Sequence, residues 1–308
     1  MRLAGIDIGT LTCRLLVADV SFSQELKEIY ADRRILRLGE GVDQHKRLSV
    51  EAMDRVVETL KDWRTHTTKY DLDSLVIVAT SAVRDSSNRK EFLTRIKQET
   101  GWDVEVLTGE EEARRTLLGI RVGLPDAMTD FLGLDIGGGS TECLLDRKGQ
   151  SSKVVSLDLG VVRLLERVFP HDPPTMQDIG NAEMCIDEQL AKVVQAFGRL
   201  PNIPLVGTAG TVTTLAAMAQ SLNHYDRTRV HNSVLTLSKI NSLEKDLIEK
   251  TGSERLHMPG LESGREYVIV AGTIILRRLM ETFKFKTCLV SDYGLREGIL
   301  VDLATKKT

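Results

Sequence analysis

The sequence predicts an α/β protein built from two related halves. Apolar runs typical of strands alternate with amphipathic stretches typical of helices along its 308 residues, a length that suits two domains. LAGIDIGTLTCRLLVADV (residues 3–20) and LGLDIGGGSTECLL (residues 132–145) share one plan: an apolar run, Asp-Ile-Gly, hydroxyl residues and a second apolar run. Such internal similarity indicates duplication.

We place the first domain at 1–124 and the second at 125–296, and expect a C-terminal helix at 297–308 to pack back on the first domain. The first domain is predicted to contain a hairpin at 2–20, strands at 26–37, 74–80 and 103–107, and helices at 49–67, 89–100 and from Thr108. The second is predicted to contain strands over 131–158, helices near 160–168 and 175–197, a strand–turn–helix at 203–218, one long helix at 263–283 and a strand at 286–291.

Glycine-rich turns follow the first apolar run of both repeated stretches. Glycine lets such a turn reach positive φ and lets a ligand approach the backbone. Successive N–H groups form an anion site, and flanking carboxylates suit a phosphate that carries a divalent cation. The alternative is an ordinary glycine-rich hairpin. The candidate phosphate ligands are Gly9, Thr10 and Thr12 in the first turn and Gly137, Gly138, Gly139, Ser140 and Thr141 in the second, flanked by the carboxylates Asp7, Asp135 and Glu142.

A third turn of this kind lies in IPLVGTAGTVTTLAAM, residues 203–218. Its strand–turn–helix pattern is typical of a phosphate or nucleoside site at a helix N-terminus. Gly207, Gly210 and Thr211 are its candidate ligands.

Composition narrows the class of protein. The net charge of −3 gives no global basic field that would draw nucleic acid. The four cysteines show no metal-ligand spacing and suit a reducing compartment. No apolar run approaches the roughly 20 residues that span a bilayer, and the N-terminus begins directly on a strand. We therefore expect a cytoplasmic protein that binds neither nucleic acid nor membrane.

Seven segments, in order along nearly the whole chain, resemble the exopolyphosphatase/guanosine pentaphosphate phosphohydrolase family, a branch of the superfamily of actin, the sugar kinases and the heat-shock chaperone ATPases. They are GIDIGTLTCRLLV (5–17), LRLGEGV (36–42), ATSAVRDSSN (79–88), LTGEEEARRTLLGI (107–120), LDIGGGSTECLL (134–145), GTAGTVTTLA (207–216) and DYGLREGIL (292–300). The resemblance implies two actin-like (ribonuclease H-like) domains with the active site in the cleft between them. It also implies the short, two-domain form of the family and a homodimer. Leu11 departs from the family's usual Gly-Ser-Asn-Ser turn.

The implied reaction is hydrolysis of the terminal phosphoanhydride of inorganic polyphosphate, and of guanosine pentaphosphate to the tetraphosphate. The resemblance places the general base on Glu112; the alternative is a solvated first-turn carboxylate, as expected for Glu110 and Glu111. Arg84, assisted by Ser81, is the candidate clamp on phosphate, and the alternative is a surface ion pair with Asp85. Mg²⁺, or Mn²⁺ in its place, would be held by Asp7, Asp135 and Glu142.

Other interpretations stay open at this point. A polyphosphate or nucleotide phosphotransferase would use the same site, and a non-catalytic sensor would bind guanosine tetraphosphate or pentaphosphate there. The pairs Arg33/Arg34, Arg114/Arg115 and Arg277/Arg278 are either a path for a polyanion or solvated faces. HDPP, residues 171–174, is either a metal-binding pair or, as we favour, a loop.

Overall fold

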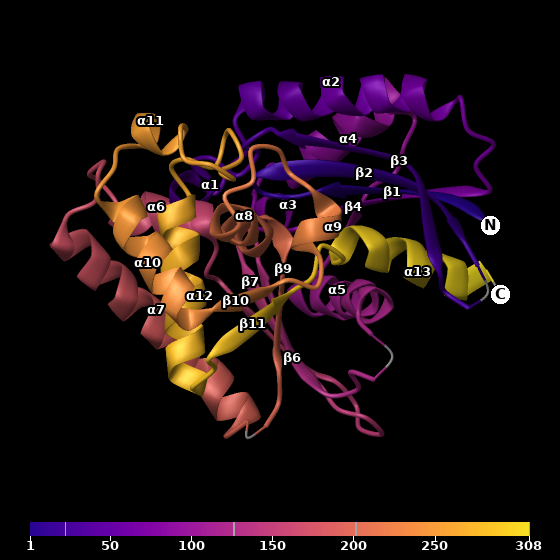
Figure 1. The fold of residues 1–308 in the computed structure, drawn as a ribbon. Helices are drawn as coiled ribbons and strands as arrows, with labels where there is room; N and C mark the ends of the chain where they lie inside the picture. The colour runs from indigo at the N-terminus through magenta and orange to yellow at the C-terminus, as the bar shows by residue number, and fades with distance from the viewer. Residues whose placement is uncertain (22, 126, 201, 308) are drawn as a thin grey trace. The chain divides into compact units, whose positions relative to one another are not determined.

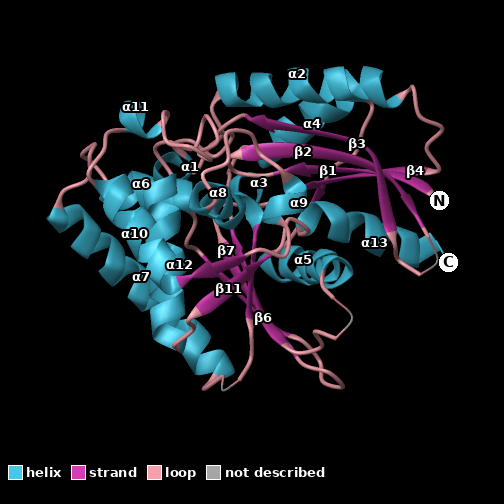
Figure 2. Cartoon of the chain, in the orientation of Figure 1, coloured by secondary structure: helices cyan, strands magenta, loops and turns pink. Residues whose placement is uncertain are grey.

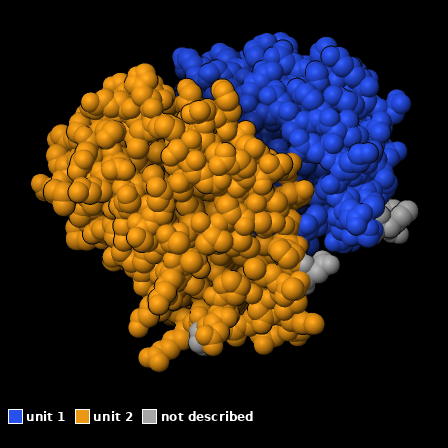
Figure 3. Space-filling view, in the orientation of Figure 1, with its two compact units in different colours: residues 1–122, 294–308 blue, residues 123–293 orange. Residues whose placement is uncertain are grey.

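The computed structural model describes residues 1–21, 23–125, 127–200 and 202–307. The chain folds into two compact units, coloured separately in Figure 3. Unit 1 comprises Met1–Val122 with Gly294–Thr308, and unit 2 comprises Gly123–Tyr293. The chain passes between the units at 122–123 and 293–294, two to three residues before the boundaries that we placed from the sequence. Each unit holds one mixed sheet with helices (Figure 2), which confirms the predicted α/β class.

Unit 1 contains a five-stranded sheet in the order β3-β2-β1-β4-β5. Figure 1 labels β1 to β4 of this sheet. β1 pairs antiparallel with β2 and parallel with β4, and β4 pairs parallel with β5. The carboxyl ends of β1, β4 and β5 therefore lie at one edge of the sheet. The elements are β1 (Arg2–Ile8), β2 (Thr12–Val20), β3 (Leu26–Ile35), α1 (Val42–His45), α2 (Val50–Thr67), β4 (Ser74–Ala79), α3 (Ser81–Arg84), α4 (Arg89–Thr100), β5 (Glu105–Val106), α5 (Gly109–Gly123) and α13 (Leu295–Lys307).

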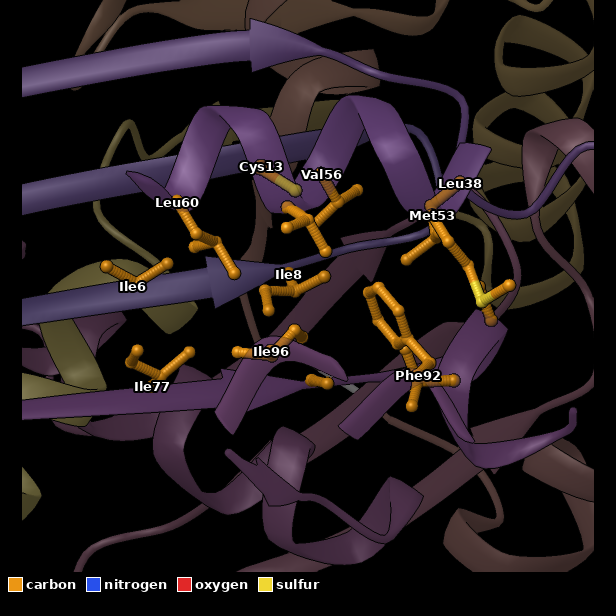
Figure 4. Packing of buried hydrophobic residues seen from close by; sticks show 14 of the residues in the cluster. Ile6, Ile8, Cys13, Leu38, Met53, Val56, Leu60, Ile77, Phe92 and Ile96 are labelled. Carbon is orange, nitrogen blue, oxygen red and sulfur yellow. The ribbon is translucent and has the colours of Figure 1, made fainter. Parts of the chain in front are cut away.

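Alternation along β1 supplies side chains to two cores. Ile6 and Ile8 join the cluster formed with α2 and α4 (Figure 4). Leu3, on the opposite face, packs with Leu300 of α13. Gly5 shares that face, and a Cβ there would lie 2.8 Å from Ile299 Cδ1, so the absence of a side chain lets α13 approach the sheet. The period of two places Asp7 on the same face.

Unit 2 contains a six-stranded sheet in the order β10-β11-β9-β6-β7-β8. β6 pairs antiparallel with β7 and parallel with β9, as β1 does with β2 and β4, so the duplication seen in the sequence recurs in the topology. α12 packs against α6, α7, α8 and α10. The elements are β6 (Phe131–Ile136), β7 (Thr141–Asp146), β8 (Lys153–Leu157), α6 (Val161–Val168), α7 (Met176–Phe197), β9 (Leu205–Thr208), α8 (Ala209–Ala219), α9 (Arg227–Val230), β10 (Val234–Thr236), α10 (Leu237–Ile248), α11 (Gly252–Arg255), α12 (Ile269–Phe283) and β11 (Thr287–Val290).

The predicted starts of two helices are confirmed, and each has a capping side chain. Ser49 Oγ accepts a hydrogen bond from Ala52 N at 3.2 Å, which starts α2 where the sequence placed it. Thr175 and Asp178 form a capping box at the start of α7. Within the described ranges no helix is both long and apolar enough to cross a bilayer.

The predicted long helix at 263–283 is wrong at its N-terminal end, because α12 begins only at Ile269. Gly260 (φ 83°) and Gly264 (φ 95°) adopt left-handed backbone conformations, which a right-handed helix cannot continue through. The residues before α12 instead form a loop that brings Arg265 to the third predicted turn.

Candidate active site

The predicted site residues of unit 1 gather where β1, β4 and β5 end. Thr80 N donates to Ile8 O at 3.2 Å, and Leu107 N donates to Ala79 O at 2.9 Å, so the loops that follow the three strands begin side by side. Ligands of open α/β sheets bind at the carboxyl ends of parallel strands. The first phosphate turn, α3 and the first turn of α5 all begin at this edge.

The turn after β1 is closed by a hydrogen bond from Gly9 N to Thr12 O at 3.0 Å. A Cβ on Gly9 would lie 2.8 Å from Thr12 O, so close approach explains the glycine. Thr10 O accepts from Gly39 N at 2.8 Å, and Leu11 O accepts from Leu36 N at 2.9 Å. Because the peptide unit is planar and trans, carbonyls held on that side turn the N–H groups of Leu11 and Thr12 to the other side.

The turn after β6 repeats this geometry: Gly137 N donates to Ser140 O at 3.0 Å. The start of α6 holds its carbonyls. Val161 N donates to Gly137 O at 3.0 Å, Val162 N donates to Gly138 O at 2.8 Å, and Arg163 Nε donates to Gly139 O at 2.8 Å. Planarity therefore turns three successive N–H groups, those of Gly138, Gly139 and Ser140, toward the opposite side. Such a row of N–H groups is an anion-binding concavity.

The expectation that these glycines adopt positive φ is wrong. Among the described residues, the glycines with positive φ are at 41, 101, 149, 198, 260 and 264, and the turn glycines are not among them. Close packing explains two of the turn glycines instead, because a Cβ on Gly137 would lie 3.1 Å from Ser140 O and one on Gly9 would be closer still to Thr12 O.

Register places a charged pair beside each turn. Asp135 lies opposite Glu142, and Asp7 lies opposite Arg14, so each pair shares one face of its hairpin. Asp135 and Glu142 are 8% and 1% exposed, and Glu142 Oε1 accepts a hydrogen bond from Ser156 Oγ at 2.8 Å. Two neighbouring buried carboxylates disfavour each other's charge, and a divalent cation with oxygen ligands would stabilise both. Within the described residues no cluster of three or more metal-ligating side chains occurs.

Arg84 and Glu112 form an ion pair in unit 1. Arg84 Nη1 lies 3.0 Å from Glu112 Oε2 and donates to Leu107 O at 2.9 Å. Asp85 is a second partner of Arg84, with Oδ1 at 3.8 Å from Nε, and Asp85 Oδ2 accepts from Ser81 Oγ at 3.2 Å. The two residues proposed for clamp and base, which are 28 positions apart in the sequence, are therefore in direct contact.

The three glutamates at the start of α5 have different environments. Glu112 is only 8% exposed, so the solvated alternative does not describe it. Glu110 is exposed and pairs with Arg114. Glu111 accepts hydrogen bonds from Thr108 N and Thr108 Oγ1 at 2.8 and 2.9 Å, and the Thr108 N–H lowers the pKa of its carboxyl. Glu111 thus caps the helix that carries Glu112.

The third predicted turn differs from the first two. Gly207 lies inside β9, where a Cβ would meet Cys288 Sγ and Val212 Cγ1 at 2.9 Å, so its role is packing. The left-handed residue is Ala209 (φ 68°), a strained conformation of the kind that gathers at functional sites. A Cβ on Gly210 would lie 2.0 Å from Arg265 Nη2, so a guanidinium occupies the space above this glycine. The sequence offers no signal for Arg265, because it belongs to no motif and fell within the predicted helix at 263–283.

Several hydroxyls predicted to bind phosphate are buried and make contacts within their own unit. Thr141 Oγ1 donates to Leu159 O, and Thr211 Oγ1 donates to Ile136 O at 3.4 Å. Thr10, Thr12 and Ser140 are buried within their turns. The hydroxyls of Thr141 and Thr211 therefore brace the turns that carry them.

Carboxylates pair with five arginines of the basic pairs, namely Arg34, Arg114, Arg115, Arg277 and Arg278. Arg278 Nε pairs with Asp187 at 3.0 Å, and Arg277 Nε with Glu244 at 2.7 Å. Arg115 pairs with Glu105 at 2.7 Å. Arg34 pairs with Asp62 at 2.8 Å. Each of these arginines thus has a carboxylate partner within its own unit.

HDPP forms a loop, as we favoured. His171 Nδ1 lies 3.0 Å from Asp178 Oδ2, and Asp172 Oδ1 lies 3.1 Å from Arg255 Nη1. Both residues are thus engaged with protein groups of unit 2.

These features define a class: a duplicated α/β protein that presents amide-lined anion turns beside carboxylates at the carboxyl edges of its sheets. The model of the Ppx/GppA phosphatase family matches residues 16–307. Exopolyphosphatase 2 of Mycobacterium tuberculosis is 35% identical over 317 residues, covering 98% of this chain and 98% of the relative. The chain belongs to the Ppx/GppA phosphatase family.

Solved structures agree with this assignment. The crystal structure of the Aquifex aeolicus member of the Ppx/GppA family has a TM-score of 0.84 and 34% identity, covering 100% of this chain and 99% of that chain. An exopolyphosphatase from Cytophaga hutchinsonii has a TM-score of 0.92 and 30% identity, covering 99% and 98%.

Proposed function

We propose that the protein is an exopolyphosphatase that hydrolyses the terminal phosphoanhydride of inorganic polyphosphate and releases orthophosphate. The observation that carries the proposal is the row of N–H groups at Gly138, Gly139 and Ser140, all turned to one side by the start of α6. Rows of this kind bind phosphate groups in many proteins. The names of the relatives in Mycobacterium tuberculosis and Cytophaga hutchinsonii support the same substrate.

Glu112 is the proposed general base, and Arg84 is its partner. The guanidinium at 3.0 Å holds the Glu112 carboxylate in one orientation. Glu112 removes a proton from water as the water oxygen bonds to the terminal phosphorus and the bridging P–O bond breaks. The shortened polyphosphate leaves. Arg84 also offers donors to the phosphate oxygens, since a guanidinium matches phosphate geometry.

Mg²⁺ is the proposed cofactor, with Mn²⁺ as its substitute. Asp135 and Glu142 fit such an ion because they are neighbouring buried oxygen donors. Asp7 is the corresponding carboxylate of unit 1, and it lies opposite Arg14 where Asp135 lies opposite a second carboxylate. When bound, the ion would neutralise phosphate charge.

Arg265 extends the proposed phosphate contacts in unit 2. Its guanidinium covers Gly210, where the sequence predicted a phosphate ligand, and its side chain is 4% exposed. A cation at this turn would hold a further phosphate of the chain. Gly207, Thr141 and Thr211 then act as supports of the turns.

Guanosine pentaphosphate presents the same kind of terminal anhydride, so its hydrolysis to the tetraphosphate belongs to the proposal. A phosphotransferase would give a phosphorylated acceptor instead of free phosphate, and a sensor would bind without turnover. The homodimer stays a prediction of the family resemblance, and the cytoplasmic location stays a prediction from the composition of the sequence.

The test is phosphate release from long-chain polyphosphate, guanosine pentaphosphate and ATP, each with Mg²⁺ and with the metal chelated. We expect release from polyphosphate that chelation abolishes. Glu112→Gln is the catalytic control, and Glu110→Gln, on the exposed side of the same helix turn, is the matched control that keeps activity. Absence of release from all three substrates by the folded wild type would contradict the proposal.

A further inference from the structure

The HDPP loop contacts the α11 region through one carboxylate. Asp172 Oδ2 accepts a hydrogen bond from Gly252 N at 2.7 Å, and Asp172 Oδ1 lies 3.1 Å from Arg255 Nη1. These partners are about 80 residues away in the sequence. The carboxylate thus joins the loop before α7 to the segment that follows α10.

Arg255 contacts both Asp172 and the backbone beside Arg265. Its side chain is 2% exposed. Nε donates to Leu247 O at 2.9 Å, and Nη1 donates to Glu266 O at 3.0 Å. Nη2 has no hydrogen-bond partner among the described residues. Burial lowers the pKa of Arg255 and the charge of Asp172 opposes this, so the buried guanidinium depends on that carboxylate.

Glu266 is the neighbour of Arg265, and local hydrogen bonds fix the conformation of both residues. Gly264 N donates to Glu266 Oε2 at 2.6 Å, and Arg265 Nε donates to Glu262 Oε2 at 2.6 Å. The same segment is held from a second side, because a Cβ on Gly252 would lie 2.4 Å from the Tyr267 ring. A shift of the Arg255 anchor therefore moves the backbone that places Arg265 over Gly210.

We propose that Asp172, acting through Arg255, is a positioning residue that holds Arg265 at the Gly210 turn and so sets the affinity for polyphosphate. The inference rests on the proposed function, in which Arg265 contacts phosphate. It gives the HDPP loop a role at the ligand-binding turn through a chain of side-chain and backbone contacts within unit 2. A purely structural role would change stability without acting through Arg265.

The experiment compares Asp172→Asn, Arg265→Met and the double variant, with His171→Ala as the matched control from the same loop. Asn keeps an acceptor for Gly252 N–H but removes the charge beside Arg255. We expect Asp172→Asn to raise KM for polyphosphate about tenfold, with kcat changed less than about twofold, as lost uniform binding does. In the Arg265→Met background the same change should add less than about twofold, since coupled residues are not additive. His171→Ala should leave both constants unchanged.

Circular dichroism establishes that each variant is folded, and Asp172→Glu, which keeps the charge on Arg255 but displaces it, replaces Asp172→Asn if that variant does not fold. An unchanged KM, or effects that multiply in the double variant, would overturn the inference. Calorimetric titration with tripolyphosphate measures the binding affinity of the same two single variants and the double variant, without turnover. If the wild type binds tripolyphosphate but releases no phosphate, the hydrolysis proposal is refuted, and the binding affinities of the variants still test whether Asp172 acts through Arg265. A wild type that neither binds nor hydrolyses would overturn both.

Discussion

Replacing Gly160 with alanine tests the packing that orients the second anion turn. Gly160 has φ −133° and ψ 164°, an extended conformation that alanine adopts without strain. The added Cβ would, however, lie 2.3 Å from Gly138 O, below the 3.0 Å that real contacts respect. The start of α6 must therefore move away from the turn by at least about 0.7 Å.

The displacement weakens the hydrogen bonds from Val161 N to Gly137 O and from Val162 N to Gly138 O. Each is worth about 1 kcal/mol net, and more where a carbonyl is left buried without a partner. Alanine also restricts the unfolded chain, which offsets about 0.4–1 kcal/mol. We expect the free energy of unfolding to fall by about 2 kcal/mol and Tm to fall by about 4–8 °C. Affinity for tripolyphosphate should fall at least about tenfold, because the amides of Gly138, Gly139 and Ser140 lose their common direction.

Denaturant unfolding and calorimetric titration with tripolyphosphate measure the two effects. Gly180→Ala is the matched control, since Gly180 lies within α7 and nothing lies within 4 Å of its Cβ position. That change should stabilise the protein by about 0.5–1 kcal/mol through helix propensity and leave affinity unchanged. A Gly160→Ala protein with wild-type stability and affinity would refute the claim that α6 aligns the turn.

Three further predictions concern the proposed catalytic residues Glu112 and Arg84 and the cysteines. Glu112→Gln should lower kcat by roughly 10²–10⁴, the usual contribution of a general base, in a phosphate-release assay in which Glu110→Gln stays active; equal turnover of the two would exclude Glu112. Arg84→Met should lower kcat/KM for polyphosphate at least about tenfold, and Arg84→Lys should recover part of the loss, so an unchanged kcat/KM would remove Arg84 from the site. Burial raises the pKa of the Cys13 and Cys143 thiols and raises that of Cys288 to about 12, so these three thiols stay protonated at pH 8. When the native protein is alkylated and analysed by mass spectrometry, only Cys185, which is partly exposed, should be modified. Rapid labelling of Cys13 in the folded protein would contradict its burial.

Local sequence signals predicted most of the elements correctly. Ser49 and Thr175 mark helix starts because a hydroxyl cap satisfies N–H groups a few residues away. The signal fails at residues 263–268, where the sequence predicted that the helix already begins but Gly264 adopts a left-handed conformation and α12 starts only at Ile269. Tertiary contacts of Arg265 and Glu266 outweigh helix propensity there.

The sequence by itself determined the duplicated plan, the positions of the two glycine-rich turns and the membership of the family, because repeated motifs and alternating apolar residues are local in the chain. Only the tertiary structure decided that Glu112 is buried against Arg84 while Glu110 faces solvent, since neighbouring glutamates on a helix look alike until another element packs on one of them. It also decided the direction of the turn amides, which depends on α6, some 20 residues further along. Contacts between residues distant in sequence set the burial of a side chain and the orientation of a backbone amide, and a sequence motif alone specifies neither.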